Sequence, residues 1–252
     1  MKKAYNCVLE IKKEIARGIF DFTVISEEIA KEAKPGQFLH ITCSDAVFLR
    51  RPISICDAGN GRVRFIFEIK GKGTEELAKK ELGDAINIMG PLGNGFTISD
   101  EYKNAAIIGG GIGVFPLYML AKQVWNPAVF LGFRSRDRVV MEEEFEKISE
   151  LQLATDDGSH GYHGYAAELL KQHLSQKPCD IIYACGPVPM LKAVQGIAAE
   201  AGIKCQLSME QRMGCGIGAC LVCTCETTRP GTEKMARVCK NGPVFWAEEV
   251  VF

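Results

Sequence analysis

The chain has 252 residues, of which 47% are hydrophobic and 24% are charged, and its formal net charge is −1. This length suits two domains with a small addition. The balanced charge excludes a broad nucleic-acid-binding surface, and no run approaches the roughly 18 apolar residues that cross a bilayer. Charges at positions 10, 12 and 13 interrupt any signal-peptide core, so we expect a cytoplasmic protein with neither nucleic-acid nor membrane partners.

Residues 1–99 are expected to form an antiparallel β-barrel. Short runs of β-branched and aromatic residues alternate there with turns that contain glycine, and many short strands with this spacing favour a closed barrel. We expect strands near 8–11, 20–24, 38–42 and 63–67, and one helix near 74–80. The glycine-rich segment 90–95 breaks the pattern close to the domain boundary.

Residues 100–209 change to a strand–helix alternation. Such alternation indicates an α/β domain with a doubly wound parallel sheet, helices on both faces and right-handed crossovers. Residues 210–252 are rich in glycine and cysteine, too irregular for another strand–helix unit, and are expected to form a small third domain. The expected strands are 105–108, 129–133, 151–155, 181–185 and 203–208, and the expected helices are 113–124, 142–148, 164–174 and 187–200.

Eleven cysteines are the unusual feature of the composition. Six are scattered among apolar stretches, where we interpret them as small buried hydrophobic residues. The other five crowd between positions 215 and 239, and four of these match the C-x4-C-x2-C…C spacing of plant-type 2Fe–2S proteins. The scattered cysteines are Cys7, Cys43, Cys56, Cys179, Cys185 and Cys205, and the predicted cluster ligands are Cys215, Cys220, Cys223 and Cys239.

This spacing has a physical reason, because a tight loop brings three thiolates around a compact cluster and the fourth returns from a more distant segment. Glycines in that loop leave room for backbone N–H groups to point at the sulfur atoms. Zinc would also accept four thiolates, but structural zinc sites favour paired C-x2-C units and only one is present. Disulfides are expected even less than zinc, because they suit a chain with a secretory signal and this sequence shows none. We interpret the fifth thiol, Cys225, as packing.

A glycine-rich turn at 109–113 follows a predicted strand and begins a helix. Its predicted nucleotide-binding residues are Gly109, Gly111 and Gly113, since glycine lets the backbone approach a pyrophosphate. The turn departs from the usual fingerprint at Pro116, and no acidic residue ends the next strand, so a purely structural turn stays open. A second candidate, Cys185-Gly186, lies at the carboxyl end of another strand, where open α/β sheets bind ligands. A plain strand–helix turn explains it too.

Two further candidates lie in the predicted barrel. Arg51-Pro52-Ile53-Ser54 offers a forked cation suited to phosphate and a small hydroxyl on a strand edge, and a solvated turn is the alternative. Gly73-Thr74 begins a helix, and Thr74 is also a candidate N-cap.

The order of these motifs along the chain resembles the ferredoxin–NADP reductase superfamily: RPIS, GT, GPLGNGF, GGGIG and CGP. Together with EQRMGCGIGAC and VCKNGPVF near the C-terminus, it resembles the electron-transfer subunits of type B, NAD-linked dihydroorotate dehydrogenases over nearly the whole chain. The resemblance implies a barrel that binds FAD, a second domain that binds NAD and a small 2Fe–2S domain. It also implies an FMN-containing catalytic subunit as partner in a hetero-oligomer, serving pyrimidine biosynthesis.

The resemblance also assigns roles to the barrel residues. Arg51 would contact the FAD pyrophosphate, while Pro52, Ile53 and Ser54 would run along the flavin. Ile66, Phe67 and Glu68 would face the same cofactor, and Gly73 and Thr74 would present a helix N-terminus to its phosphates. Cys215, Cys220, Cys223 and Cys239 would ligate the cluster, and Glu210 would lie near the flavin.

Two alternatives stay open. A subunit of an NADPH-dependent ferredoxin or sulfide-linked oxidoreductase would share this architecture, and Arg134, Arg136 and Arg138 could then receive a 2′-phosphate, or simply form a solvated loop. A zinc-binding regulatory module with a vestigial nucleotide fold is the alternative from another class. Nucleotide preference distinguishes the NADPH-dependent oxidoreductase subunit from the NAD-linked family. Metal analysis of the purified protein distinguishes a zinc-binding module from a protein with an iron–sulfur cluster.

Overall fold

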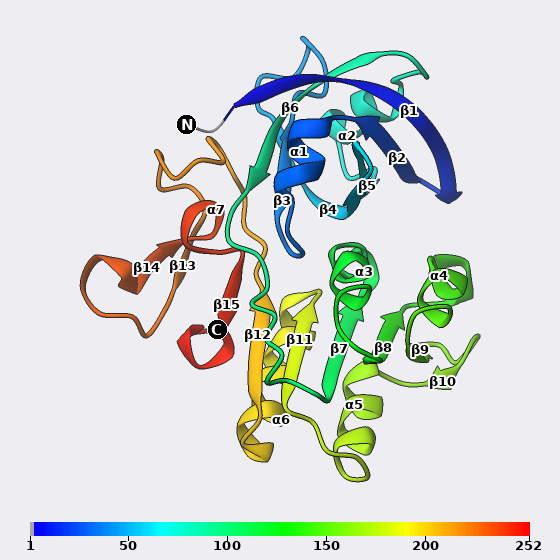
Figure 1. Ribbon diagram of the computed structural model, residues 1–252, viewed down its shortest axis with the longest axis vertical. Coiled ribbons are helices and arrows are strands. Elements are labelled where there is room, and N and C mark those ends of the chain that lie inside the picture. Colours follow the sequence, from blue (N-terminus) through cyan, green and yellow to red (C-terminus); the bar gives the residue numbers. More distant parts are fainter. Residues whose placement is uncertain (1–2) are drawn as a thin grey trace.

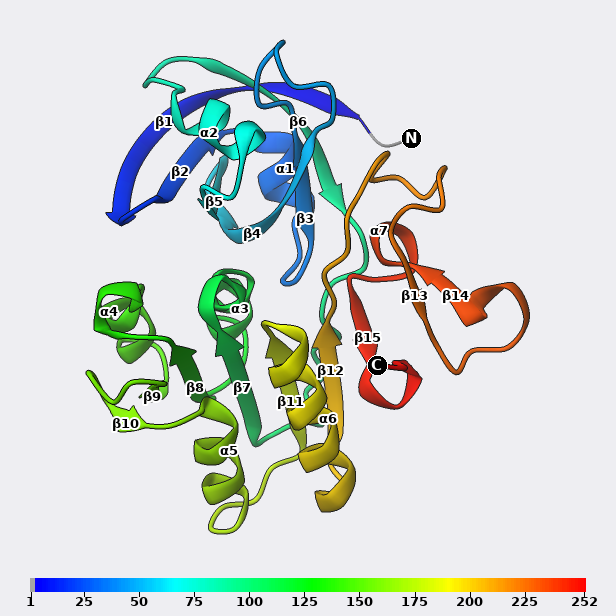
Figure 2. The same cartoon turned by 180° about the vertical axis from the view of Figure 1, so that it is seen from behind.

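The computed structural model describes residues 3–252, so Met1 and Lys2, with which the first predicted domain begins, lie outside the described residues. Three parts are arranged around a common centre: a barrel, an open sheet with helices, and a small cysteine-rich part beside them (Figures 1 and 2). This arrangement confirms the predicted fold class. No described helix has both the length and the apolar character needed to cross a membrane.

The predicted antiparallel barrel is confirmed. Its strands close in the order β1-β2-β5-β4-β3-β6. Alternate residues point inward, as the period of a strand requires; on β5, for example, Val63, Phe65 and Phe67 join the barrel core. The barrel elements are β1 (Ala4–Ala16), β2 (Ile19–Ile25), α1 (Glu27–Glu32), β3 (Phe38–Ile41), β4 (Arg51–Gly59), β5 (Arg62–Glu68), α2 (Lys72–Ala78) and β6 (Ala85–Leu92).

Several features of the barrel differ from the sequence prediction. Strand β6 was not among the expected strands, and it continues to Leu92, into the segment where a break in the pattern was expected. Helix α1 was not expected, although Ser26 caps it by accepting a hydrogen bond from the Ile29 backbone N–H. Helix α2 begins at Lys72 with Gly71 as its N-cap, so the N-cap prediction for Thr74 was wrong. The Thr74 hydroxyl instead accepts a hydrogen bond from the Lys70 N–H at 2.9 Å, which fixes the turn ahead of the helix.

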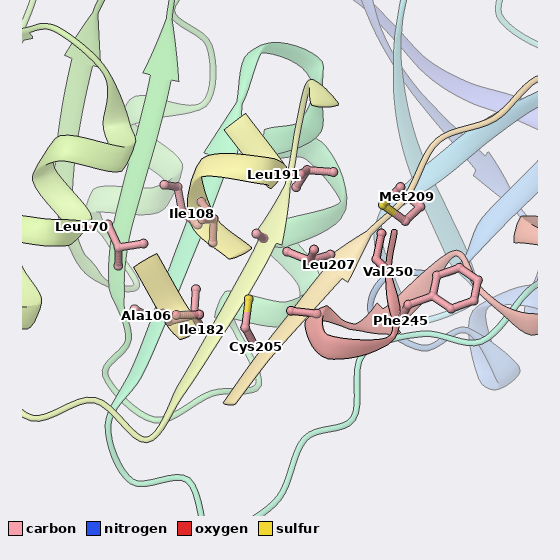
Figure 3. Packing of buried hydrophobic residues seen from close by; sticks show 14 of the residues in the cluster. Ala106, Ile108, Leu170, Ile182, Leu191, Cys205, Leu207, Met209, Phe245 and Val250 are labelled. Atoms are coloured by element: carbon pink, nitrogen blue, oxygen red, sulfur yellow. The ribbon is translucent and has the colours of Figure 1, made fainter. Parts of the chain in front are cut away.

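The second part is a sheet in the order β10-β9-β8-β7-β11-β12-β15, parallel except at β15. Helices α5 and α6 pack against one face (Figure 3) and α3 and α4 against the other, which confirms the doubly wound sheet. Its elements are β7 (Ala105–Gly110), α3 (Phe115–Ala121), β8 (Ala128–Phe133), α4 (Glu142–Glu146), β9 (Glu150–Thr155), β10 (Tyr162–His163), α5 (Ala166–Leu174), β11 (Ile181–Cys185), α6 (Val188–Ala201) and β12 (Lys204–Ser208).

The C-terminal part is a cysteine-rich loop followed by a small hairpin, β13 (Thr224–Glu226) and β14 (Met235–Arg237), and by α7 (Val238–Asn241). The chain then returns to the large sheet, where β15 (Val244–Trp246) pairs antiparallel with β12. Phe245 and Val250 therefore pack into the same core as Leu207 (Figure 3). The third predicted domain, 210–252, thus shares its last strand with the second one.

Charged side chains join the barrel to the sheet domain. Arg64 of β5 makes a forked ion pair with Asp21 of β2 and a second one with Glu144 of α4, at 2.7 and 2.6 Å. Lys122, just after α3, pairs with Asp57 of β4 at 2.7 Å. Because a mostly buried guanidinium with two carboxylate partners has few alternative orientations, these contacts hold the two parts in a fixed relation.

Candidate functional site

A cleft of about 1430 Å³ lies where the three parts meet. Every residue that the sequence predicted to bind a cofactor lines it, with the exception of Gly109. The cleft therefore brings together motifs that lie more than a hundred residues apart in the chain. Its predicted lining residues are Arg51, Pro52, Ile53, Ser54, Ile66, Phe67, Glu68, Gly73, Thr74, Gly111, Gly113, Cys185 and Gly186.

The barrel wall of the cleft is built from β4, β5 and the turn before α2. The Arg51 guanidinium lies directly against Gly73, because a Cβ atom at that glycine would be 2.4 Å from Arg51 Nε. Arg51 Nη1 donates to the Leu49 carbonyl at 2.6 Å, and among the described residues no carboxylate pairs with it. A partly exposed cation held in this way is free to receive an anionic group of a ligand.

The opposite wall is formed by the carboxyl ends of β7 and β11, which are adjacent parallel strands. Gly113 packs tightly on the turn that follows β11. A Cβ atom at Gly113 would lie 2.5 Å from the Cys185 carbonyl oxygen. Gly109 does not line the cleft. It faces α3, where a Cβ atom would meet Leu117 and Val114 at 2.9 and 3.0 Å, so it allows close packing of the helix on the strand.

Cys185 ends β11 in the cleft wall. Burial raises the pKa of its thiol to about 12, and a hydrogen bond involving Ser208 only partly opposes this shift. The thiol is therefore protonated at neutral pH, and it is unsuited to act as a thiolate nucleophile or metal ligand.

Sequence reasoning missed several residues of the cleft. Lys70 and Lys72 flank the Gly71 turn and bring two more cations to the Arg51 side, which the repeated Lys-Gly pattern could have signalled. Asp137, which follows β8, was also missed. Its neighbour Arg138 forms an ion pair with Glu68 across the two walls. Of the three arginines named as candidates for a 2′-phosphate, Arg134 and Arg138 line the cleft and Arg136 does not.

The chain leads directly from the cleft to the cysteines. Residues 209–213, which include Glu210, line the cleft, and Cys215 follows two residues later. The four predicted ligands form two pairs. The sulfur atoms of Cys215 and Cys220 are 3.3 Å apart, and the backbone N–H of Cys239 points at the sulfur of Cys223 at 3.5 Å. Gly218 N–H joins the pairs by donating to the Cys239 sulfur at 3.1 Å.

Backbone N–H groups and burial act in opposite directions on the thiols of this site. Burial opposes ionisation of Cys215, but hydrogen bonds from the Cys220, Ile217 and Ala219 backbone and from the Cys220 thiol outweigh it and lower the Cys215 pKa to about 6. At Cys239, burial and the neighbouring Cys223 raise the pKa to about 12. The loop thus already favours a thiolate at Cys215, the form that binds metal.

The pairing of the sulfur atoms fits a binuclear group. In a 2Fe–2S cluster four thiolates are shared between two irons, and the Cys215–Cys220 and Cys223–Cys239 pairs supply two each. Among the side chains that the structure describes, no three His, Cys, Asp or Glu groups converge on one point, so the four sulfur atoms are arranged as two pairs. Cys225 lies outside both pairs and is buried on β13, in agreement with its interpretation as packing.

Around the cysteines the surface is apolar and exposed. Leu221 and Val222 lie between the second and third ligands and are 72% and 57% exposed, and Ile217 is 47% exposed. Large hydrophobic side chains gathered on one exposed loop mark a surface that another molecule covers.

Comparison with solved structures defines the class of protein. An NADH-dependent reduced ferredoxin–NADP oxidoreductase has the same fold at a TM-score of 0.89, with 32% identity over 100% of this chain and 91% of that one. A ferredoxin reductase of carbazole 1,9a-dioxygenase superimposes with a TM-score of 0.69 at 19% identity, covering 80% of this chain and 66% of that one, which shows the fold alone. The protein is thus an oxidoreductase of the ferredoxin–NADP reductase type.

Sequence comparison gives the family. Residues 107–196 match the oxidoreductase NAD-binding domain, and residues 210–251 match the iron–sulfur cluster binding domain of dihydroorotate dehydrogenase B. The electron transfer subunit of dihydroorotate dehydrogenase B (NAD(+)) of Caldanaerobacter subterraneus is 40% identical over 95% of both chains, and that of Geobacillus thermodenitrificans is 42% identical over 95% of both chains. This chain belongs to the family of dihydroorotate dehydrogenase B electron transfer subunits.

Proposed function

We propose that this chain carries electrons between an FMN-containing dihydroorotate dehydrogenase subunit and NAD, through a 2Fe–2S cluster and FAD that it holds itself. The observation that carries the proposal is the single cleft, which joins a barrel wall rich in cations, a nucleotide-type glycine turn and the segment that leads into the paired cysteines. The cofactors supply complementary chemistry: nicotinamide moves a hydride, a 2Fe–2S centre moves single electrons and flavin exchanges both.

The residues of the chain position these groups. Arg51, supported by Lys70 and Lys72, binds the FAD pyrophosphate, and Gly73 lets the guanidinium lie close to the backbone. Pro52, Ile53 and Ser54 of β4 contact the flavin, as do Ile66, Phe67 and Glu68 of β5. Gly111, Gly113, Cys185 and Gly186 receive the nicotinamide nucleotide on the opposite wall. Cys215, Cys220, Cys223 and Cys239 bind the cluster.

The exposed surface of the cluster loop supports a proposal for the partner and the assembly. We propose that the exposed Ile217, Leu221 and Val222 dock on the FMN-containing catalytic subunit in a hetero-oligomer, so that the cluster lies beneath the contact. We also propose a cytoplasmic location in which pyrimidine biosynthesis uses the complex. None of the eleven cysteines forms a disulfide, which suits a compartment that keeps thiols reduced.

Steady-state assays of the separate and mixed components test the proposal. The isolated chain should oxidise NADH with an artificial acceptor and should not oxidise dihydroorotate, whereas the mixture should show dihydroorotate-dependent NAD reduction. Leu221→Asp should abolish the coupled reaction and leave NADH oxidation by the isolated chain intact. Trp125→Asp is the matched control, because Trp125 is 87% exposed on the sheet domain between α3 and β8. Dihydroorotate oxidation by the isolated chain, or no binding between the components, would contradict it.

A second candidate function is supported by the similarity to an NADH-dependent reduced ferredoxin–NADP oxidoreductase over the whole chain. In this case the partner would be a ferredoxin-linked subunit and the native nucleotide could carry a 2′-phosphate. Arg134 and Arg138 line the cleft and could receive that phosphate, while Asp137 between them opposes it. Steady-state rates with NADH and NADPH, measured with the chain alone, discriminate between the two functions.

A further inference from the structure

Strand β3 connects the cleft with the cysteine loop through its outer face. Leu39 and Ile41 point into the barrel core, so Phe38 and His40 lie on the opposite face of the strand. Phe38 lines the cleft, whereas His40 is only 1% exposed. On this face of β3, Phe38 therefore belongs to the cleft, whereas His40 lies buried outside the cleft lining.

The imidazole of His40 is buried without a polar partner. Among the described residues, neither of its ring nitrogens makes a hydrogen bond, and the nearby Arg50 backbone only partly offsets the effect of burial on the pKa of the ring. A buried polar group left in this state is costly, and native proteins retain such groups where function uses them. Burial, reinforced by the Arg50 guanidinium, lowers the pKa of His40 to about 4, so the ring is neutral and carries one N–H donor at pH 7.

The cysteine loop lies directly across from this ring. A Cβ atom at Gly216 would be 2.5 Å from His40 Nδ1, so the α-carbon of Gly216 is in contact with the imidazole. Gly216 has a φ of +69°, which favours glycine, and it follows the predicted ligand Cys215. In Figures 1 and 2 the orange segment that follows β12 rises beside β6, the strand that pairs with β3 at His40.

We propose that His40 is a positioning residue that donates its ring N–H hydrogen bond to one sulfur atom of the iron–sulfur site, and that this bond raises the reduction potential of the cluster. The proposal rests on the proposed function, since it requires the cluster at Cys215, Cys220, Cys223 and Cys239. Hydrogen bonds to cluster sulfur stabilise the reduced state because that state carries one more negative charge. His40 would thereby set how readily the cluster accepts an electron.

Isotope labelling tests the contact in the unaltered protein. The chain contains four histidines, so nitrogen-15 histidine gives few signals, and pulsed electron paramagnetic resonance of the reduced cluster should detect one coupled ring nitrogen. The coupling should disappear in His40→Gln. Iron and acid-labile sulfide are measured on the same samples. A protein that binds neither overturns the cluster site and this inference together, whereas a loaded protein without nitrogen coupling overturns this inference alone.

Redox titration tests the consequence. At a fixed potential near the midpoint, His40→Leu should raise the ratio of oxidised to reduced cluster about tenfold, which corresponds to a shift of about 59 mV to lower potential for a one-electron centre. His40→Gln keeps an N–H donor and should recover part of the shift. His173→Leu is the matched control, since it removes another buried imidazole, from α5 against Phe130. An unchanged ratio in His40→Leu, or an equal change in His173→Leu, would overturn the proposal. The isotope measurement decides the question if His40→Leu fails to fold.

Discussion

Replacing Arg51 by alanine is the sharpest test of the flavin site. Its guanidinium lines the cleft, and its hydrogen bonds within the described residues go to the backbone carbonyls of Leu49 and Arg50 at 2.6 and 3.4 Å. The fold therefore loses little when it is removed. A bound pyrophosphate would lose a charge-assisted contact worth about 1.5–3 kcal/mol, so we expect FAD affinity to fall about 10- to 150-fold.

The assay is titration of FAD into flavin-free protein, followed by the change in flavin fluorescence, with iron and sulfide content measured in parallel. Arg51→Lys should lie between the wild type and Arg51→Ala, because it keeps the charge and loses the fork. Arg62→Ala is the matched control: it removes an arginine from β5 whose ion pair with Glu10 lies away from the cleft. An FAD dissociation constant within twofold of the wild type in Arg51→Ala, or an equal loss of iron, would refute the placement.

Three further variants test the cluster, the connection between the domains and the nucleotide site. Cys220→Ser should remove the visible absorption and iron of the cluster, whereas Cys225→Ser should keep both; equal iron in the two variants would contradict the ligand assignment. Arg64→Ala should lower the free energy of unfolding by about 3 kcal/mol or more, measured by urea denaturation, because it leaves two carboxylates without their cation. Asp137→Ser should raise the kcat/KM ratio of NADPH to NADH at least about fivefold, since a carboxylate near a phosphate costs about 1 kcal/mol or more; Arg136→Ser, outside the cleft, should not do so.

The parts of the fold that the sequence predicted are those with local signals. Short runs of β-branched and aromatic residues between glycine-containing turns marked the barrel strands, and strand–helix alternation marked the parallel sheet. The elements that the sequence did not predict depend on non-local contacts or are too short to give a pattern. Strand β15 has three residues and exists because it pairs with Gln206, Leu207 and Ser208 of β12, and α1 has six residues, too few for a clear period.

The site shows the same division. The motifs at Arg51, Cys185 and the cysteine loop identified most of the cleft because they specify backbone shape and chemical type. Phe38 and His40 could not be identified in this way, since their roles depend on the face of β3 to which they belong and on which segment packs against that face. Gly109 shows the converse, because this motif position lies against Leu117 and Val114 and outside the cleft lining.

The way in which the cysteine loop is attached explains how a small irregular segment can hold a redox centre in a fixed position. The loop leaves the sheet after Ser208 and returns at Val244, and these two residues pair with each other. The next pair inside the loop is also bonded, since Met209 N–H donates to the Pro243 carbonyl at 2.8 Å. On the barrel side, the Asn94 amide donates to two carbonyls of α7 at 3.1 Å. Because its ends are fixed to two domains, the cysteine loop has little freedom to shift. Electron transfer requires redox centres at a constant distance from one another, and rigid elements keep that distance.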